Sequence, residues 1–240
     1  MRLVLCDNYE DLSKRAAKLV TSQMLLKPTS VLGFATGSTP IGLYHNLIQF
    51  YQKGELDFSE IVSFNLDEYY PISPKNHQSY RYFMNENLFN HVNLDSKNTF
   101  LLSGEAEDVE KECDAYERKI VAYGGIDLQI LGIGQNGHIA FNEPEEHLIA
   151  KTHMTGLTEN TIQANARFFA SAADVPTKAL TMGMATIMQA RKIILLANGK
   201  VKHKALTELL GGTMTTQNPS TLLKLHADVV IFCDKEAYEG

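Results

Sequence analysis

Short runs of aliphatic residues alternate with longer amphipathic segments along most of this 240-residue chain. Aliphatic runs bounded by polar or turn-forming residues are typical of buried β-strands, and apolar residues that repeat with a period of about 3.6 are typical of helices covering a core. This alternation predicts an α/β fold with a mostly parallel sheet flanked by helices. Because no linker, repeat or low-complexity tract interrupts the pattern, we predict a single domain over residues 1–240.

The pattern gives a residue range to each expected element. Strands are predicted at residues 2–6, 30–34, 61–65, 126–131, 193–197 and 229–233. Helices are predicted at residues 9–26, 40–53, 78–90, 105–123 and 201–210. Sheets of this type bind ligands beyond the carboxyl ends of their strands. We therefore expect the polar loops that begin at Thr36, Asp67 and Gly132 to converge there.

Composition argues against several classes of partner. The net charge is −6 and no run of Lys or Arg is present, so we expect no nucleic-acid ligand. No apolar stretch is long enough to cross a membrane. Cys6, Cys113 and Cys233 lie far apart, without metal-binding or redox spacing, which indicates a cytoplasmic protein with buried, unreactive thiols.

The segment from Gly132 to Pro144 carries the strongest signal for chemistry. It follows a predicted strand, is rich in glycine and contributes His138 and Glu143. Glycines allow close approach to a ligand, and an imidazole beside a carboxylate suits proton transfer near neutral pH. The alternative is a structural histidine bonded to backbone, but the neighbouring Glu143 and glycines favour the catalytic interpretation.

The same segment contains a G-x-G-x-x-G pattern at Gly132, Gly134 and Gly137. A dinucleotide site also needs a helix that opens at the last glycine and an acidic residue about 20 positions later. Here the loop continues through Asn142 to Pro144, and proline disfavours a helix both at its own position and at the one before. We therefore expect no nicotinamide cofactor.

Two other loops each have a functional and a structural interpretation. The loop after the second predicted strand contains Thr36, Gly37, Ser38 and Thr39. Its amides, hydroxyls and helix dipole could cradle a phosphate, or it could be a simple helix cap. Asp67 and Glu68 follow the third strand and should point oppositely on an extended backbone, so that one can enter a site while the other makes structural contacts. The alternative is a solvated acidic turn.

Several basic residues give weaker signals. Arg167 and Lys202 are individually unremarkable, because most basic side chains lie at the surface. Lys202 lies near a predicted helix N-terminus, where the helix dipole disfavours a positive charge. Its presence there is a weak indication of an anionic partner. The remaining histidines have no metal-binding spacing, and we interpret them as structural: His45, His77, His91, His147, His203 and His226.

Three blocks, in this order, resemble the deaminases of the glucosamine/galactosamine-6-phosphate isomerase family. They are Ala35-Thr-Gly-Ser-Thr-Pro40, Phe64-Asn-Leu-Asp-Glu-Tyr69 and Gly132-Ile-Gly-Gln-Asn-Gly-His-Ile-Ala-Phe-Asn-Glu-Pro144. The resemblance covers essentially the whole chain and implies a modified Rossmann-like single domain. It also implies an enzyme of the hydrolase class that converts glucosamine 6-phosphate and water to fructose 6-phosphate and ammonia, with no cofactor and no catalytic metal.

The resemblance assigns a role to each candidate residue. It implies that Asp67 is the base that moves a proton between C2 and C1, and that His138, with Glu143, is the acid/base of ring opening. It implies that Arg167, Lys202 and the loop 36–39 grip the phosphate. The complete implied substrate-binding set is Thr36, Gly37, Ser38, Thr39, Glu68, Gly137, Arg167 and Lys202, with Glu68 in a supporting position.

One catalytic position departs from the family pattern, because many members have Asp where this chain has Asn136. Asn can accept a hydrogen bond from a histidine N–H and orient the ring, but it cannot stabilise an imidazolium by charge. We expect Glu143 to supply that charge.

Assembly and two rival functions complete the expectations. Regulated hexameric members of the family have a basic pair spaced i and i+2 after the Asn-Glu-Pro motif, and the matching positions here are His153 and Thr155. We therefore expect a monomer without an anionic effector site. The alternative is that Lys151, two residues before His153, substitutes for the missing cation. The rivals are a 6-phosphogluconolactonase-like hydrolase and a non-catalytic sugar-phosphate sensor.

Overall fold

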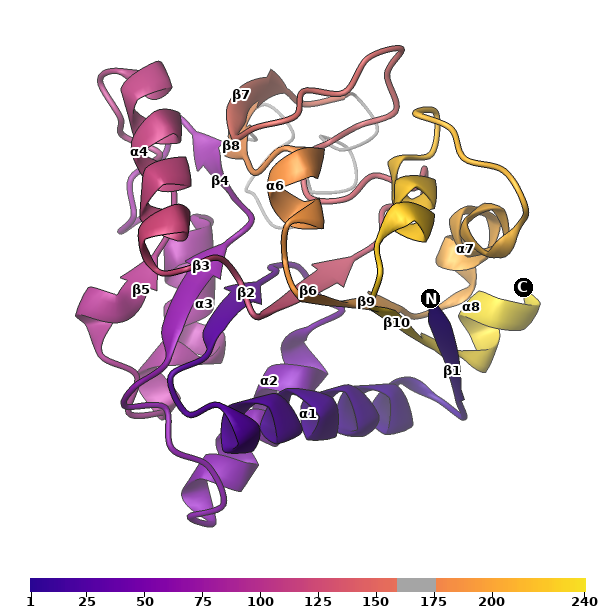
Figure 1. Ribbon diagram of the computed structural model, residues 1–240, viewed down its shortest axis with the longest axis horizontal. Helices are drawn as coiled ribbons and strands as arrows, with labels where there is room; N and C mark the ends of the chain where they lie inside the picture. The colour runs from indigo at the N-terminus through magenta and orange to yellow at the C-terminus, as the bar shows by residue number, and fades with distance from the viewer. Residues whose placement is uncertain (159–175) are drawn as a thin grey trace.

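The computed structural model describes residues 1–158 and 176–240 of the chain. A seven-stranded parallel sheet lies at its centre (Figure 1). Its strands lie in the order β1 (Arg2–Cys6), β10 (Val229–Asp234), β9 (Lys192–Ala197), β6 (Leu128–Gly132), β2 (Val31–Phe34), β3 (Val62–Asn65) and β5 (Thr99–Phe100). All neighbouring strands in this sheet are parallel, as predicted. The segments that follow β2, β3, β6 and β9 therefore leave from one edge.

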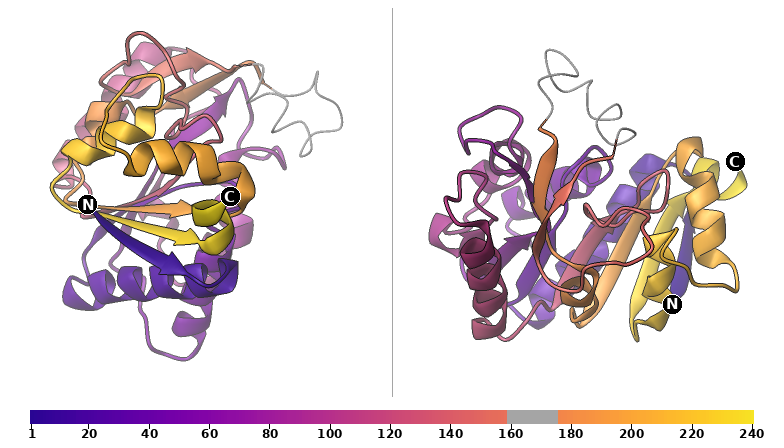
Figure 2. Two further views of the ribbon diagram at one scale, coloured as in Figure 1. Left: turned by 90° about the vertical axis from the view of Figure 1, so that its right-hand side faces the viewer. Right: turned by 90° about the horizontal axis from the view of Figure 1, so that it is seen from above.

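Helices cover both faces of this sheet (Figures 1 and 2). The helices α1 (Tyr9–Leu26) and α2 (Ile41–Gln52) lie side by side on one face. The opposite side carries α6 (Met184–Met188) and α7 (His203–Leu210). The remaining helices in residues 1–158 and 176–240 are α3 (Tyr80–Asn87), α4 (Val109–Ala122), α8 (Lys235–Glu239) and the short 3-10 helices η1 (Phe89–His91), η2 (Ser96–Asn98), η4 (Lys200–Lys202) and η5 (Pro219–Leu225).

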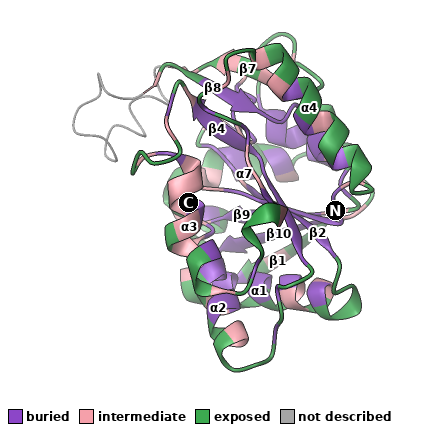
Figure 3. Cartoon of the chain, turned by 90° about the vertical axis from the view of Figure 1, so that its left-hand side faces the viewer, coloured by how far each residue is buried: buried purple, intermediate pink, exposed green. Residues whose placement is uncertain are grey.

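Local sequence explains where α1 begins and which face it buries. The Asn8 side chain accepts a hydrogen bond from the Asp11 amide at 3.0 Å, which caps the first turn. Leu12, Ala16 and Val20 recur every four residues and are fully buried. Buried residues likewise dominate the strands of the large sheet, whereas the helices show exposed outer faces (Figure 3).

A second, smaller sheet corrects the prediction of a polar loop at Asp67. It is antiparallel and consists of β4 (Asp67–Tyr70), β8 (Lys178–Thr181) and β7 (His153–Gly156), in that order. Asp67 is the first residue of β4 and pairs with Thr181. The segment after β3 therefore leaves the large sheet and at once enters another, which gives the backbone at Asp67 and Glu68 a fixed direction.

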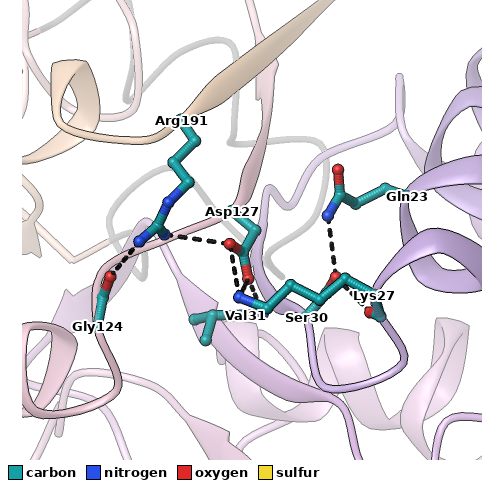
Figure 4. Close-up of polar contacts among 7 residues, drawn as sticks. All are labelled: Gln23, Lys27, Ser30, Val31, Gly124, Asp127 and Arg191. Atoms are coloured by element: carbon teal, nitrogen blue, oxygen red, sulfur yellow. Dashed lines mark hydrogen bonds and ion pairs between the residues drawn. The ribbon is translucent and has the colours of Figure 1, made fainter.

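A buried carboxylate joins several elements at the opposite edge of the large sheet (Figure 4). Asp127, just before β6, accepts hydrogen bonds from Lys27 Nζ at 2.7 and 2.9 Å, from Arg191 Nη1 at 3.1 Å and from the Val31 amide at 2.8 Å. Asp127 is 4% exposed. These contacts tie the end of α1, the start of β2 and the start of β9 together, far from the carboxyl ends of the strands.

The cysteines lie inside the fold and do not form a disulfide. Cys6, Cys113 and Cys233 are all buried and unpaired, as predicted. In residues 1–158 and 176–240, no helix is long and apolar enough to span a membrane.

Candidate functional site

A tight turn follows β6 and presents His138. The Gly134 amide donates to the His138 carbonyl at 2.9 Å, and the Gly137 amide donates to the Gly134 carbonyl at 3.0 Å. Gly137 has a φ of +85°, a left-handed conformation that favours glycine. Gly134 lies directly against the imidazole, where a Cβ would collide with the ring. Gly134 and Gly137 thus shape the turn that carries His138.

His138, Glu143 and Asn136 form one polar group within this segment. His138 Nδ1 lies 3.3 Å from Glu143 Oε1, which is ion-pair distance without hydrogen-bonding geometry. Glu143 is buried, whereas about a quarter of the His138 side chain is exposed (26%). The arrangement leaves the ring open to solvent on one side and beside a carboxylate on the other.

Asn136 contacts the Glu143 carboxylate and the backbone of His138. Its Nδ2 donates to Glu143 Oε2 at 2.7 Å, and its Oδ1 accepts from the His138 backbone amide at 3.2 Å. The carboxamide therefore orients the carboxylate and the turn rather than the imidazole ring. Asn fits this place because it offers a donor to a carboxylate, which an ionised Asp could not do.

Asp67 is a buried carboxylate at the start of β4. It is 6% exposed, and within the described residues its side chain makes no hydrogen bond. Burial, and secondarily the charge of Glu68, raises the pKa of Asp67 well above its usual range. A carboxylate with few stabilising contacts is a stronger base than an exposed one, and such groups are concentrated at functional sites.

Glu68 uses its carboxylate to hold a helix. It accepts hydrogen bonds from the backbone amides of Tyr69 at 2.9 Å, Tyr80 at 2.8 Å and Arg81 at 3.0 Å. Tyr80 and Arg81 are the first residues of α3, where a carboxylate also stabilises the helix dipole. Burial raises the pKa of Glu68 to about 7 even though these amides favour the charged form. The two acidic neighbours therefore differ in their contacts, as the alternation along a strand predicted.

Aromatic rings connect the three segments that were expected to converge. Tyr69 lies 4.8 Å from Tyr80 and 5.7 Å from Phe141 between ring centroids, and Phe141 belongs to the segment between His138 and Glu143. Burial raises the pKa of the Tyr80 phenol well above its usual range, and its hydrogen bond to the Thr36 side chain acts in the opposite direction. Tyr80 was not among the predicted site residues, because its contacts join segments that are distant in sequence.

The hydroxyl of Tyr9, in the first turn of α1, holds the loop that contains Thr36, Gly37, Ser38 and Thr39. Tyr9 Oη donates to the Ser38 and Thr39 carbonyls at 3.1 and 3.0 Å, and it accepts from the Gly42 amide at 2.8 Å. No side chain caps the start of α2. Within the described residues the amides of positions 37–39 donate to no other group, which leaves them available for an anion.

Thr39 connects this loop to the segment that carries Lys202. Its Oγ1 donates to Asn198 Oδ1 at 2.7 Å, so this hydroxyl has a structural partner. Asn198 follows β9, and Lys202 ends η4 and directly precedes α7. The two elements predicted to grip a phosphate are thus adjacent. Arg167, the third predicted member, lies outside the described residues.

The side chains that most often bind metals are dispersed. Among residues 1–158 and 176–240, no three or more His, Cys, Asp or Glu side chains lie close enough to hold a metal ion.

Comparison with known sequences gives full-length matches. A family model described as glucosamine-6-phosphate isomerases/6-phosphogluconolactonase matches residues 7–232. A glucosamine-6-phosphate deaminase of Thermoanaerobacter pseudethanolicus is 55% identical over 237 residues, covering 99% of this chain and 94% of that protein. One from Halothermothrix orenii is 56% identical and covers 99% of this chain and 98% of that protein.

Solved structures agree with these matches. A monomeric glucosamine-6-phosphate deaminase superposes with a TM-score of 0.97 and 43% identity, covering 100% of this chain and 99% of that one. The 6-phosphogluconolactonase of Thermotoga maritima has a TM-score of 0.76 and 23% identity over 98% of this chain and 99% of that one, which is a likeness of fold alone.

Proposed function

Because the chain belongs to the glucosamine-6-phosphate isomerase/6-phosphogluconolactonase family, we propose that it is an enzyme that deaminates glucosamine 6-phosphate. The products are fructose 6-phosphate and ammonia, and one water is consumed. The observation that carries this proposal is the buried Asp67 carboxylate, which makes no hydrogen bond within the described residues. Such a group suits the removal of a proton from carbon, the step that an aldose–ketose conversion requires.

Ring opening is the task we propose for His138. The imidazole takes the O1 proton and returns a proton to the ring oxygen, and it passes through a charged state between the two transfers. Glu143 Oε1, 3.3 Å from Nδ1, stabilises that charge. Asn136 keeps the carboxylate in place through its 2.7 Å bond to Oε2.

The open-chain sugar then isomerises at Asp67. The carboxylate removes the C2 proton and delivers it to C1 on the same face while O1 gains a proton, which leaves an iminium at C2. Water adds to that carbon to give a carbinolamine, which loses ammonia to form the ketone. Burial raises the pKa of Asp67, and a higher pKa makes it a better acceptor for a weakly acidic C–H proton. Glu68 supports this step indirectly, because its bonds to α3 hold the start of β4.

The phosphate of the substrate is proposed to lie on the amides of Gly37, Ser38 and Thr39, near Lys202. Backbone amides before a helix and a lysine are common phosphate ligands. The Thr39–Asn198 bond keeps these two parts together. Arg167 remains a third proposed ligand on the basis of the family resemblance alone.

One assay separates this proposal from a lactonase activity on the same fold. Purified protein should release ammonia and fructose 6-phosphate in equal amounts from glucosamine 6-phosphate, and Asp67→Asn should stop both. Hydrolysis of 6-phosphogluconolactone at a comparable rate, with no ammonia from the amino sugar, would refute the proposal. Binding of sugar phosphates without any turnover would instead indicate a sensor.

A further inference from the structure

A buried asparagine, Asn218, supports the turn that carries His138, although nothing in the chemistry above uses it. Asn218 is 1% exposed and immediately precedes η5. Its Nδ2 donates to Glu208 Oε2 at 2.9 Å and to the Ala205 carbonyl at 3.3 Å. Its Oδ1 accepts from Ser220 Oγ at 2.5 Å. The carboxamide is therefore fixed in orientation by partners at both of its ends.

The same residues grip the backbone immediately before His138. The Ser220 amide donates to the Gly137 carbonyl at 2.9 Å. Asn218 packs so closely on Gly137 that a Cβ there would collide with its side chain. Gly137 is thus held on its carbonyl and at its Cα, in the left-handed conformation at φ +85°. A shift of Asn218 must move the peptide that sets the position of the imidazole.

Helix α7 connects this support to the proposed phosphate grip. Lys202 is the residue at the N-terminal end of α7, and Glu208 lies in its last turns. A rigid helix of this length transmits a displacement at one end to the other. The chain of contacts runs from Lys202 along α7 to Glu208, Asn218 and Gly137.

We propose that Asn218 is a positioning residue, which holds His138 in place for ring opening through Glu208 on one side and Gly137 on the other. The proposal rests on the function proposed above. Misplacing a catalytic group by a fraction of an ångström slows the chemical step more than it weakens binding. Disturbing Asn218 should therefore lower kcat more than it changes KM.

The test exchanges donor and acceptor across the Asn218–Glu208 contact. Asn218→Asp replaces the donor with a carboxylate that faces Glu208, and Glu208→Gln then supplies an N–H that can donate to it. We expect Asn218→Asp to lower kcat about tenfold or more with KM nearly unchanged, and the double variant to recover most of the loss. Gln217→Ala, an exposed neighbour, is the matched control and should behave as the parent. Ser220→Ala is a milder change, because it removes only the hydroxyl that donates to Asn218 Oδ1. It should lower kcat to a smaller extent, and it replaces Asn218→Asp in the test if that variant does not fold.

A measurement without turnover separates this proposal from the proposed function. The imidazole signals of ¹⁵N-labelled protein, assigned with His138→Gln, should titrate differently in Asn218→Asp and return to parental behaviour in the double variant. The proposal would be overturned if folded Asn218→Asp protein had the kcat and the His138 titration of the parent. It would also be overturned if a folded double variant recovered neither the kcat nor the titration behaviour of the parent. If the parent releases no ammonia yet the His138 signals still respond to Asn218→Asp, the proposed function fails and the positioning role stands.

Discussion

At the scale of single residues, the adjacent acids Asp67 and Glu68 differ in what surrounds their carboxylates. Glu68 accepts hydrogen bonds from three backbone amides, whereas Asp67 has no hydrogen bond within the described residues. Burial raises the pKa of both carboxyls, that of Glu68 to about 7. A carboxyl whose folded pKa exceeds its unfolded pKa stabilises the fold below the unfolded value and loses this contribution as pH rises. Both acids are therefore expected to weaken the fold as pH rises.

Asp67→Asn should remove activity and yet stabilise the protein at alkaline pH. We expect kcat to fall by roughly 10²–10⁴-fold, the usual contribution of a general base. The melting temperature should exceed that of the parent at pH 8, by about 2 °C or more, because no charge is then buried. The advantage should shrink at pH 5, closer to the ordinary Asp pKa of 3.8. Scanning calorimetry at both pH values tests this, with Asp114→Asn on the exposed side of α4 as the control. A variant that is less stable than the parent at pH 8 would contradict the expectation.

Lys202→Ala should weaken substrate binding more than it slows chemistry. A charge-assisted hydrogen bond is worth roughly 1.5–3 kcal/mol, which corresponds to a KM increase of about tenfold or more. Lys204, two residues further on and exposed, provides the control, because Lys204→Ala removes the same charge away from the loop at Asn198. Steady-state kinetics with glucosamine 6-phosphate distinguish the two. Equal KM values for both variants would exclude Lys202 from the phosphate site.

At the scale of elements, aliphatic strands were predictable and short polar ones were not. β1, β2, β3, β6, β9 and β10 lie where the sequence predicted them, give or take two residues. β4 was missed because Asp67-Glu-Tyr-Tyr70 has no aliphatic residue, and β7 is short and half-exposed. His138, Glu143 and Asp67 could be found because they follow predicted strands. Tyr80, Asn198 and Asn218 could not, since their contacts are made with segments distant in sequence.

The Asp127 cluster should matter for stability and not for catalysis. Asp127→Ala leaves the Val31 amide without its acceptor and removes the contacts that join the end of α1 to the starts of β2 and β9. We expect the free energy of unfolding to fall by roughly 2–3 kcal/mol after discounting the half-exposed Lys27 and Arg191 for solvent screening. Urea denaturation measures this loss, and kcat should stay within twofold or so. Removing the exposed Lys235–Asp7 pair by Lys235→Gln should change stability far less. A large fall in kcat of folded Asp127→Ala would show that the two edges of the sheet are coupled.

At the scale of the whole molecule, the positions His153 and Thr155 offer little to an anionic regulator. His153 and Thr155 lie on one face of β7, as their spacing predicted. Burial lowers the pKa of His153, and its Nδ1 lies 2.8 Å from the Lys151 carbonyl. A neutral imidazole and a hydroxyl are weak ligands for a phosphate at neutral pH, so no second site is expected there to couple to the first.

The enzyme should therefore behave as an unregulated monomer. We expect a hyperbolic dependence of rate on glucosamine 6-phosphate that N-acetylglucosamine 6-phosphate leaves unchanged. Light scattering should give a mass near 26.8 kDa at assay concentrations. Sigmoidal kinetics that the acetylated sugar makes hyperbolic, or a mass several times larger, would contradict this expectation.

The pairing of β1 with β10 also sets an order of events during synthesis. Arg2 pairs with Val230 and Cys6 with Asp234, so a strand made early in translation finds its neighbour only when a late one leaves the ribosome. Until then Leu3 and Leu5, which stay more than a third exposed even in the finished sheet, have no strand beside them. Non-local pairing of this kind is slow and leaves unpaired edges open to other chains. Ribosome-bound intermediates of this protein should thus be natural clients for chaperones that shield nascent apolar strands.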